Sequence, residues 1–130
     1  MAKPKMVMVI DDDPDLLESI RVILEGAGYG VMTATSGQDG LARVRRGGID
    51  CILLDVMLAR ETEGFLIAQD LKADPKTAQI PIVMLTSISK KTGFEFSPAT
   101  DKDFMPVEAF LEKPVDPKRL IETIRGVLKG

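Results

Sequence analysis

The sequence predicts a doubly wound α/β fold, in which a parallel sheet carries helices on both faces. Short apolar runs alternate along the chain with segments whose apolar residues recur at the helical period of about 3.6 residues. The chain has 130 residues, of which 45% are hydrophobic and 28% charged, a composition typical of one globular domain with a buried core. We therefore expect a single domain over residues 1–130, with its core between about residues 6 and 129.

Three strands and two helices are expected in the first half of the chain. The strand-like apolar runs are Met6–Ile10, Tyr29–Ala34 and Asp50–Leu54. Asp13-Pro14 is typical of a helix N-cap followed by the first helical residue, and this helix ends near Gly26. Ser36 begins a second helix that ends at Gly47-Gly48. The third run is almost continuously apolar, which favours a central parallel strand covered on both faces.

Two more strands and two clear helices are expected in the second half. A helix from about Gly64 to Leu71 is expected to bury Phe65, Leu66, Ala68 and Leu71. It stops before Asp74-Pro75, because a residue that precedes proline disfavours the α region. The strands are Ile80–Leu85 and Val107–Leu111, and Asp116-Pro117 begins the last helix.

The segment Ser89–Pro106 has no regular pattern. Gly93, Pro98 and Pro106 interrupt any helical period, so we expect an irregular or displaced fourth helix. Its three phenylalanines favour packing as a lid or core, and contact with a partner or second subunit is the alternative.

Composition excludes several classes of function. Lys plus Arg is 17 and Asp plus Glu is 20, so the net charge is −3, and no basic stripe predicts direct nucleic-acid binding. The absence of His excludes His-based zinc sites and Ser-His-Asp catalysis. Cys51 lies in an apolar run and is expected to be a small buried hydrophobe. No apolar stretch approaches the ~20 residues that span a bilayer, so we expect no membrane partner and a cytoplasmic location.

Polar residues follow four of the expected strands, at the sheet edge where doubly wound folds bind ligands. They are Asp11-Asp12-Asp13, Asp55, Thr86-Ser87 and Lys113-Pro114. Clustered carboxylates repel one another unless a cation neutralises them, and Mg²⁺ prefers oxygen ligands. Asp55 is a candidate nucleophile that would form an aspartyl phosphate, with Asp11 and Asp12 holding Mg²⁺ and Thr86 and Lys113 stabilising the phosphoryl oxygens. Taken singly, the acidic triplet also fits a solvated helix cap and Asp55 an ordinary loop acid.

Taken together, these segments resemble a known family. The run Val9–Pro14, the strand ending in Asp55, Leu85-Thr86-Ser87 and Phe110–Pro114 are similar to the receiver domain of two-component response regulators, in particular single-domain chemotaxis-type receivers. The resemblance implies a flavodoxin-like (βα)₅ fold with strand order 2-1-3-4-5. It also implies phosphorylation of Asp55 by a sensor histidine kinase or a histidine phosphotransfer protein.

The resemblance further implies a role for each residue of the site. Asp12 would bind Mg²⁺ directly, Asp11 through water, and the backbone carbonyl of Met57 would complete the protein ligands together with Asp55. Thr86 would bond to the phosphoryl group and Lys113 would pair with it. Phe110 matches the aromatic switch residue, and a plain core phenylalanine is the alternative. Val56–Glu63 departs from the family pattern because it lacks the common proline.

The resulting hypothesis is a signalling module that is not an enzyme beyond its own phosphorylation and dephosphorylation. Its output partner is unknown, and we expect a monomer or weak homodimer. One alternative is a haloacid-dehalogenase-like phosphatase using Asp11 and Asp13, for which Asp116 and Glu122 are the only acids after Lys113. A receiver-like module that binds partners without phosphorylation is another. An effector domain after Gly130 is equally compatible with the sequence.

Overall fold

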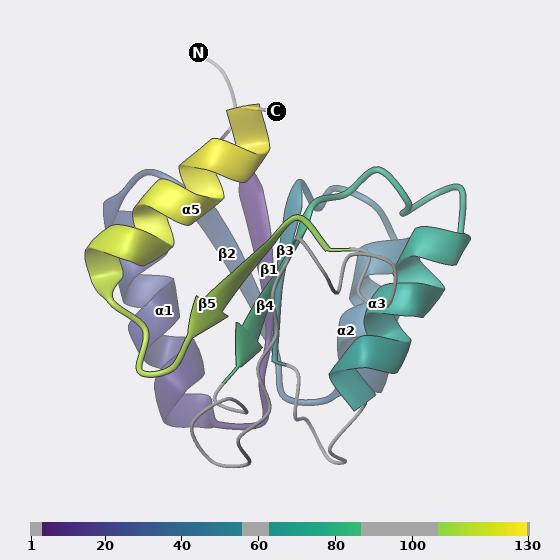
Figure 1. Ribbon diagram of the computed structural model, residues 1–130, viewed down its shortest axis with the longest axis horizontal. Coiled ribbons are helices and arrows are strands. Elements are labelled where there is room, and N and C mark those ends of the chain that lie inside the picture. The colour runs from purple at the N-terminus through teal and green to yellow at the C-terminus, as the bar shows by residue number, and fades with distance from the viewer. Residues whose placement is uncertain (1–3, 56–62, 87–106, 130) are drawn as a thin grey trace.

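The computed structural model describes residues 4–55, 63–86 and 107–129, which form one parallel sheet with helices on both faces (Figure 1). The strands lie in the order β2-β1-β3-β4-β5. The elements follow one another as β1 (Met6–Ile10), α1 (Pro14–Gly26), β2 (Gly30–Ala34), α2 (Gly37–Arg45), β3 (Cys51–Asp55), α3 (Glu63–Ala73), β4 (Ile82–Thr86), β5 (Ala109–Glu112) and α5 (Pro117–Lys129). The flavodoxin-like fold class and strand order predicted from the sequence are confirmed.

The core consists of two apolar layers, one on each face of the sheet. Because side chains alternate along a strand, Met8 and Ile10 of β1 face α2 and α3, while Val7 and Val9 face α1 and α5. Every residue of β3 and β4 is buried, as expected for parallel strands covered on both sides. Cys51 is a free, fully buried residue of β3, and burial raises the pKa of its thiol to about 12. It is therefore a core hydrophobe, as predicted.

The predicted helix starts are confirmed by their caps. Asp13 accepts hydrogen bonds from the backbone N–H groups of Asp15 and Leu16 at the start of α1. Ser36 accepts one from the N–H of Asp39 at the start of α2. These side chains satisfy donors that a helix leaves unpaired in its first turn.

β1 has its predicted bounds, and the other four strands are displaced slightly from theirs. Asp55 and Thr86 are the last residues of β3 and β4, because the ladder continues through the pairs Asp55–Leu85 and Thr86–Glu112. The start of β4 at Ile82 is later than predicted, because Ile80 still belongs to a turn in which its N–H donates to Thr77.

The prediction that Leu66 is buried is wrong. Leu66 is 58% exposed, whereas Ile67, Ala68 and Leu71 of the same helix are buried. Ile67 and Leu71 lie one above the other on the face toward the sheet, which turns Leu66 away from it.

Three sequence predictions lie outside the residues and side chains that the structure describes. They concern the irregular fourth helix in Ser89–Pro106, the backbone of Met57 and the burial of the Phe65 side chain. Within residues 4–55, 63–86 and 107–129, no helix combines the length and apolar character needed to cross a bilayer.

Two helical glycines provide a matched test of packing. A Cβ at Gly40 of α2 would lie 2.4 Å from Cδ1 of buried Ile10, whereas a Cβ at Gly126 of α5 would meet nothing within 4 Å. We expect Gly40→Ala to lower the free energy of unfolding by about 1–2 kcal/mol, because the clash outweighs the helix-propensity gain. Gly126→Ala should raise it by about 0.5–1 kcal/mol.

Urea unfolding at neutral pH measures both effects. Ile10→Val, which removes the Cδ1 atom, should recover part of the loss when it is combined with Gly40→Ala. Equal effects of the two glycine substitutions would contradict the close approach of α2 to β1.

Candidate functional site

The residues predicted to form a site follow or end the parallel strands, so they meet at one end of the sheet. Asp11 follows β1, Asp55 ends β3, Thr86 ends β4 and Lys113 follows β5. These strand ends lie at the bottom of Figure 1, away from the two termini. The register therefore brings distant parts of the chain to one place.

Asp11 is held rigidly at the end of the sheet. Its backbone N–H donates to the carbonyl of Ala34 at 3.1 Å, and its side chain is completely buried. The Oδ1 atom accepts a hydrogen bond from the N–H of Asp13 at 3.0 Å. The Oδ2 atom lies 2.9 Å from Nζ of Lys113, but no donor among the described residues is aligned to hydrogen-bond with it.

The three consecutive acids have different environments. Asp13 accepts from Asp15 N–H at 3.0 Å and from Leu16 N–H at 3.4 Å as the cap of α1. Asp12 is exposed, and it reaches the site together with buried Asp11 and Asp55. Asp13 is therefore committed to the helix, while Asp11 and Asp12 are available to a ligand.

Lys113 places one ammonium between two buried carboxylates. Its Nζ lies 2.9 Å from Asp11 Oδ2 and 3.3 Å from Asp55 Oδ1. Burial lowers the pKa of Lys113, but contacts with both carboxylates outweigh it, so the pKa is raised above the ordinary value of 10.5. Lys113 is consequently charged at neutral pH. Its peptide bond to Pro114 is cis.

The acidic cluster has the chemistry of a divalent-cation site. One carboxylate oxygen from each of Asp11, Asp12 and Asp55 lies within 4.8 Å of the other two. Three carboxylates and one ammonium carry a formal charge of −3 + 1 = −2, which a divalent ion would neutralise. The unaligned Oδ2 atom of buried Asp11 also fits such an ion. The donor set is therefore compatible with Mg²⁺.

Thr86 ends β4, and Phe110 lies on the neighbouring strand β5. Thr86 is 7% exposed, and its carbonyl accepts a hydrogen bond from the N–H of Lys113 at 3.0 Å. Phe110 is half-buried and packs against the core layer beneath α2 and α3. Met57, the remaining predicted ligand, lies outside the described residues.

The direct ion pair between Lys113 and Asp11 is not predicted by the sequence pattern. The pattern brings both residues to the same end of the sheet, but it indicates a role for Lys113 only toward an incoming phosphoryl group. No local pattern indicates a contact between residues at opposite ends of a chain.

Removing this ammonium should destabilise the protein. Lys113→Met keeps the aliphatic chain but leaves the buried carboxylates of Asp11 and Asp55 without their cation. In Mg²⁺-free buffer at pH 7 we expect the free energy of unfolding to fall by about 2–3 kcal/mol, less than for a fully buried pair because Lys113 is partly exposed. Lys118→Met on the surface of α5 is the control, with an effect of about 0.5 kcal/mol or less.

The difference in free energy of unfolding between wild type and Lys113→Met depends on pH. Since the pKa of Lys113 is higher in the folded than in the unfolded state, its contribution is complete below about 10.5 and is lost as the pH rises through the folded pKa. Urea unfolding between pH 7 and pH 11 measures this. A wild-type advantage over Lys113→Met that persists unchanged at the alkaline end would contradict the assignment.

Comparisons with known proteins identify the family. Residues 7–125 match the response regulator receiver domain. The DNA-binding dual master transcriptional regulator RpaA of Synechocystis is 35% identical over 95% of this chain and 48% of its own length. The polar-differentiation response regulator DivK of Brucella anthropi is 30% identical over 96% of this chain and 97% of its own.

A solved structure shows the same fold. The chemotaxis response regulator CheY4 of Vibrio cholerae has a TM-score of 0.80 and 28% identity, covering 95% of this chain and 98% of its own. The present chain spans about half the length of RpaA and nearly all of DivK. On the family match over residues 7–125, the chain belongs to the response regulator receiver domains of two-component signal transduction.

Proposed function

We propose that the chain accepts a phosphoryl group on Asp55 in a Mg²⁺-dependent reaction and thereby switches a partner-binding face. The observation that carries the proposal is the placement of Asp55. Asp55 is only 4% exposed and ends a wholly buried strand, and its carboxylate lies 3.3 Å from a cationic lysine within an acidic cluster. A structural acid has no need of this arrangement, whereas an acceptor carboxylate does.

The reaction is a single phosphoryl transfer. A carboxylate oxygen of Asp55 forms a bond to phosphorus, and the bond between phosphorus and the donor atom breaks, with its electron pair leaving on the donor. Lys113, already beside Asp55, stabilises the negative oxygens of the transferred group, and we assign Thr86 a hydrogen bond to them. Bound Mg²⁺ would supply charge neutralisation and orientation of these oxygens.

We assign the metal ligands to the acidic cluster. Asp12 and Asp55 would bind the ion through carboxylate oxygens, Asp11 through water, and Met57 through its backbone carbonyl. The three acids already lie within reach of one ion. The assignment of Met57 rests on family resemblance alone.

We propose that Thr86 and Phe110 report the phosphorylation state. They lie on neighbouring strands, two residues out of register, since Thr86 pairs with Glu112 and Phe110 with Met84. Phosphorylation adds contacts that only one of two conformations makes, so it shifts their populations. Phe110 is half-buried, which allows a change of ring position to alter the surface beside β5.

Receiver domains are signalling modules that interact with histidine kinases or phosphotransfer proteins. For this chain we propose such a protein as phosphodonor, an output partner still to be identified, a single domain over residues 1–130 and a monomer or weak homodimer. We propose no catalysis beyond its own phosphorylation and dephosphorylation.

The alternatives are not favoured. A haloacid-dehalogenase-like phosphatase would need Asp13 and a later acid for chemistry, but Asp13 caps α1 and Asp116 accepts from the N–H of Arg119 at the start of α5. A binding module without phosphorylation leaves the buried carboxylates and their lysine without a purpose.

The first experiment is intact-mass spectrometry after incubation with acetyl phosphate and Mg²⁺. We expect wild type to gain one phosphoryl group, Asp55→Ala to gain none, and chelation of Mg²⁺ to prevent the gain. Asp13→Asn, which keeps a good helix cap, should still be phosphorylated. A wild type without mass gain, or an Asp55→Ala variant that still gains mass, would sink the proposal.

A Mg²⁺ titration tests the metal assignment separately. Ion binding to the folded state should raise the free energy of unfolding with Mg²⁺ concentration. Asp12→Asn should weaken apparent Mg²⁺ affinity about tenfold or more, yet raise stability without Mg²⁺ because it relieves like-charge repulsion. Its neighbour Asp13→Asn is the isosteric control and should leave the affinity near that of wild type. Equal affinities of wild type and Asp12→Asn would refute the assignment of Asp12.

A further inference from the structure

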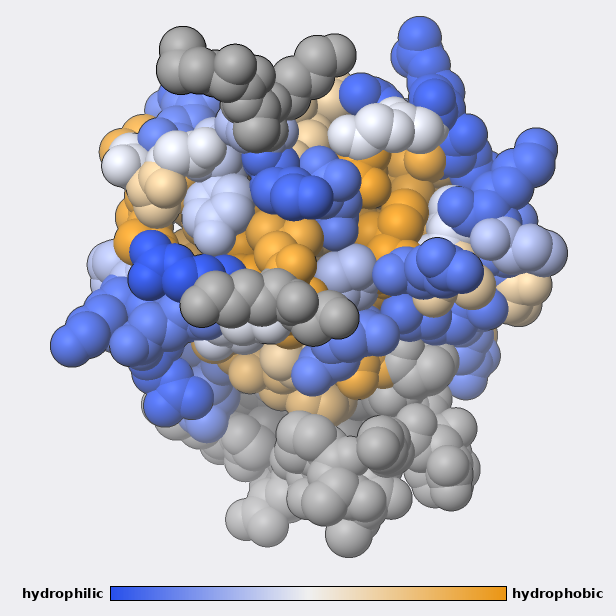
Figure 2. Space-filling view, turned by 90° about the horizontal axis from the view of Figure 1, so that it is seen from above, coloured by the Kyte–Doolittle hydropathy of each residue, from blue (hydrophilic) through white to orange (hydrophobic). Residues whose placement is uncertain are grey.

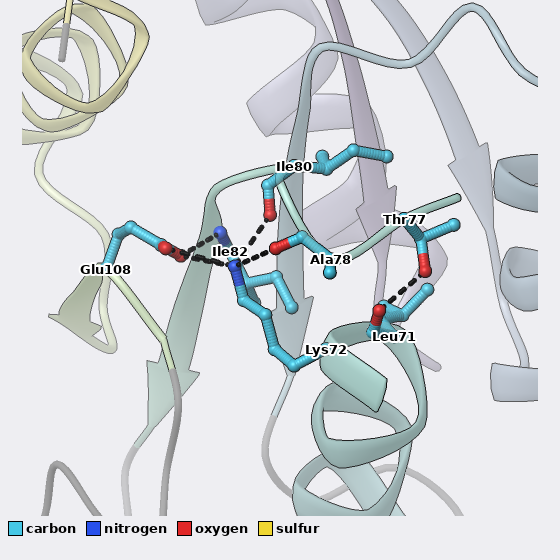
Figure 3. Close-up of polar contacts among 7 residues, drawn as sticks. All are labelled: Leu71, Lys72, Thr77, Ala78, Ile80, Ile82 and Glu108. Atoms are coloured by element: carbon cyan, nitrogen blue, oxygen red, sulfur yellow. Dashed lines mark hydrogen bonds and ion pairs between the residues drawn. The ribbon is translucent and has the colours of Figure 1, made fainter. Parts of the chain in front are cut away.

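A partly buried lysine far from the acidic site connects three segments of the chain (Figure 3). Lys72 lies in the last turn of α3, and its side chain is 15% exposed. Its Nζ donates to the carbonyls of Ala78 at 3.2 Å and Ile80 at 3.0 Å, and it pairs with Glu108 Oε2 at 3.0 Å. One ammonium therefore ties α3 to the approach to β4 and to the residue that precedes β5.

Glu108 extends the ladder between β4 and β5. Its backbone N–H donates to the carbonyl of Ile82 at 2.9 Å, and its Oε1 atom accepts from the N–H of Ile82 at 2.7 Å. In a regular parallel ladder, the N–H and the carbonyl of one residue bond to two different residues of the neighbouring strand. Here Glu108 supplies both partners of Ile82, one position before the first ladder pair, Val83 and Ala109.

The strand held by this contact is a short edge strand. β5 has four residues, lies at the edge of the sheet and, among the described residues, pairs with β4 alone. Its far end is held by the hydrogen bond from Lys113 N–H to the carbonyl of Thr86. Glu108 and Lys113 thus add a fixed point at each end of the four ladder pairs of β5.

The register matters because Lys113 must reach two carboxylates. A slip of one residue moves a strand by about 3.3 Å and turns each side chain to the opposite face. Lys113 Nζ lies 2.9 Å from Asp11 Oδ2 and 3.3 Å from Asp55 Oδ1, so such a slip removes both contacts.

We propose that Lys72 and Glu108 are positioning residues, which fix β5 in register and so hold the ammonium of Lys113 at the acidic site from the opposite end of the sheet. The positioning stands on the contacts above, and its consequence for phosphotransfer rests on the proposed function.

Solvent exposure distinguishes this role from simple stabilisation. Figure 2 shows the end of the molecule opposite the acidic site, where hydrophilic residues surround apolar ones. Glu108 lines a hollow of about 500 Å³ beside Lys5 and Asp50, and its side chain is 42% exposed. An ion pair with one partner in water contributes little to global stability. Breaking it should therefore loosen β5 much more than the rest of the sheet.

Native-state hydrogen exchange on the full chain tests the positioning. In Lys72→Met we expect the backbone amide of Lys113 to exchange about tenfold faster, while that of Val9 in β1 changes by less than about twofold. Glu108→Gln keeps an oxygen for Ile82 N–H but loses the charge, so it should show a smaller acceleration in the same direction. Lys72→Arg should restore most of the protection.

Arg45→Met is the matched control. Arg45 pairs with Asp74 at 4.0 Å near the same end of the molecule, is 53% exposed and belongs to α2, away from β5. We expect wild-type exchange at Lys113 in this variant. Equal acceleration at Lys113 and Val9 in Lys72→Met, or none at Lys113, overturns the proposal.

Phosphorylation by acetyl phosphate provides the second readout. Lys72→Met should be phosphorylated at Asp55 about threefold or more slowly than wild type and Arg45→Met, because misplacing Lys113 slows transfer. A loosened β5 with an unchanged rate overturns the link to Lys113. A wild type that accepts no phosphoryl group refutes the proposed function instead, and the exchange experiment still decides the positioning.

Discussion

The structure depends on two carboxylates buried at the end of an apolar sheet. Asp11 is fully buried and Asp55 is 4% exposed, and each directly follows residues with no exposed surface. A buried charge costs several kcal/mol unless a counter-charge and hydrogen bonds compensate for it. Among the described residues, Lys113 is the cation within ion-pair distance of both. Lys113 therefore helps to compensate for the burial of both Asp11 and Asp55.

Backbone hydrogen bonds, more than side-chain packing, determine where Asp11 and Lys113 lie. The N–H of Asp11 bonds to the end of β2, and the N–H of Lys113 bonds to Thr86 at the end of β4. Asp11 and Lys113 thus each extend the parallel ladder by one position. The ladder fixes the Cα positions of these residues. The length of each side chain then determines how close its charged group comes to that of its partner.

Much of this arrangement is predictable from sequence because it depends on local patterns. Apolar runs of strand length, the caps Asp13 and Ser36, and the helical period indicate the elements, and parallel strands bring Asp11, Asp55, Thr86 and Lys113 to one edge. The exposure of Leu66 was mispredicted, because choosing between adjacent apolar residues requires the direction in which the helix faces the sheet.

Contacts that depend on three-dimensional register were not predictable. The pairing of Lys113 with Asp11 joins residues at opposite ends of the chain, and the contact between Lys72 and Glu108 joins a helix end to an edge strand. Neither residue type nor spacing distinguishes these charges from solvated surface charges, since most Lys and Glu residues are exposed.

The elements that carry the site are supported unequally, and this difference determines where a change of charge has its effect. Asp11 and Asp55 extend β1 and β3, which have a partner strand on each side, whereas Lys113 extends the edge strand β5. On the proposed function, a new negative charge on Asp55 acts on a cation that follows an edge strand. Because Phe110 lies on that same strand, three residues before Lys113, we propose that displacement of the lysine is coupled through the strand backbone to the aromatic ring. In this proposal, the short edge strand is the element through which the acidic cluster acts on the surface.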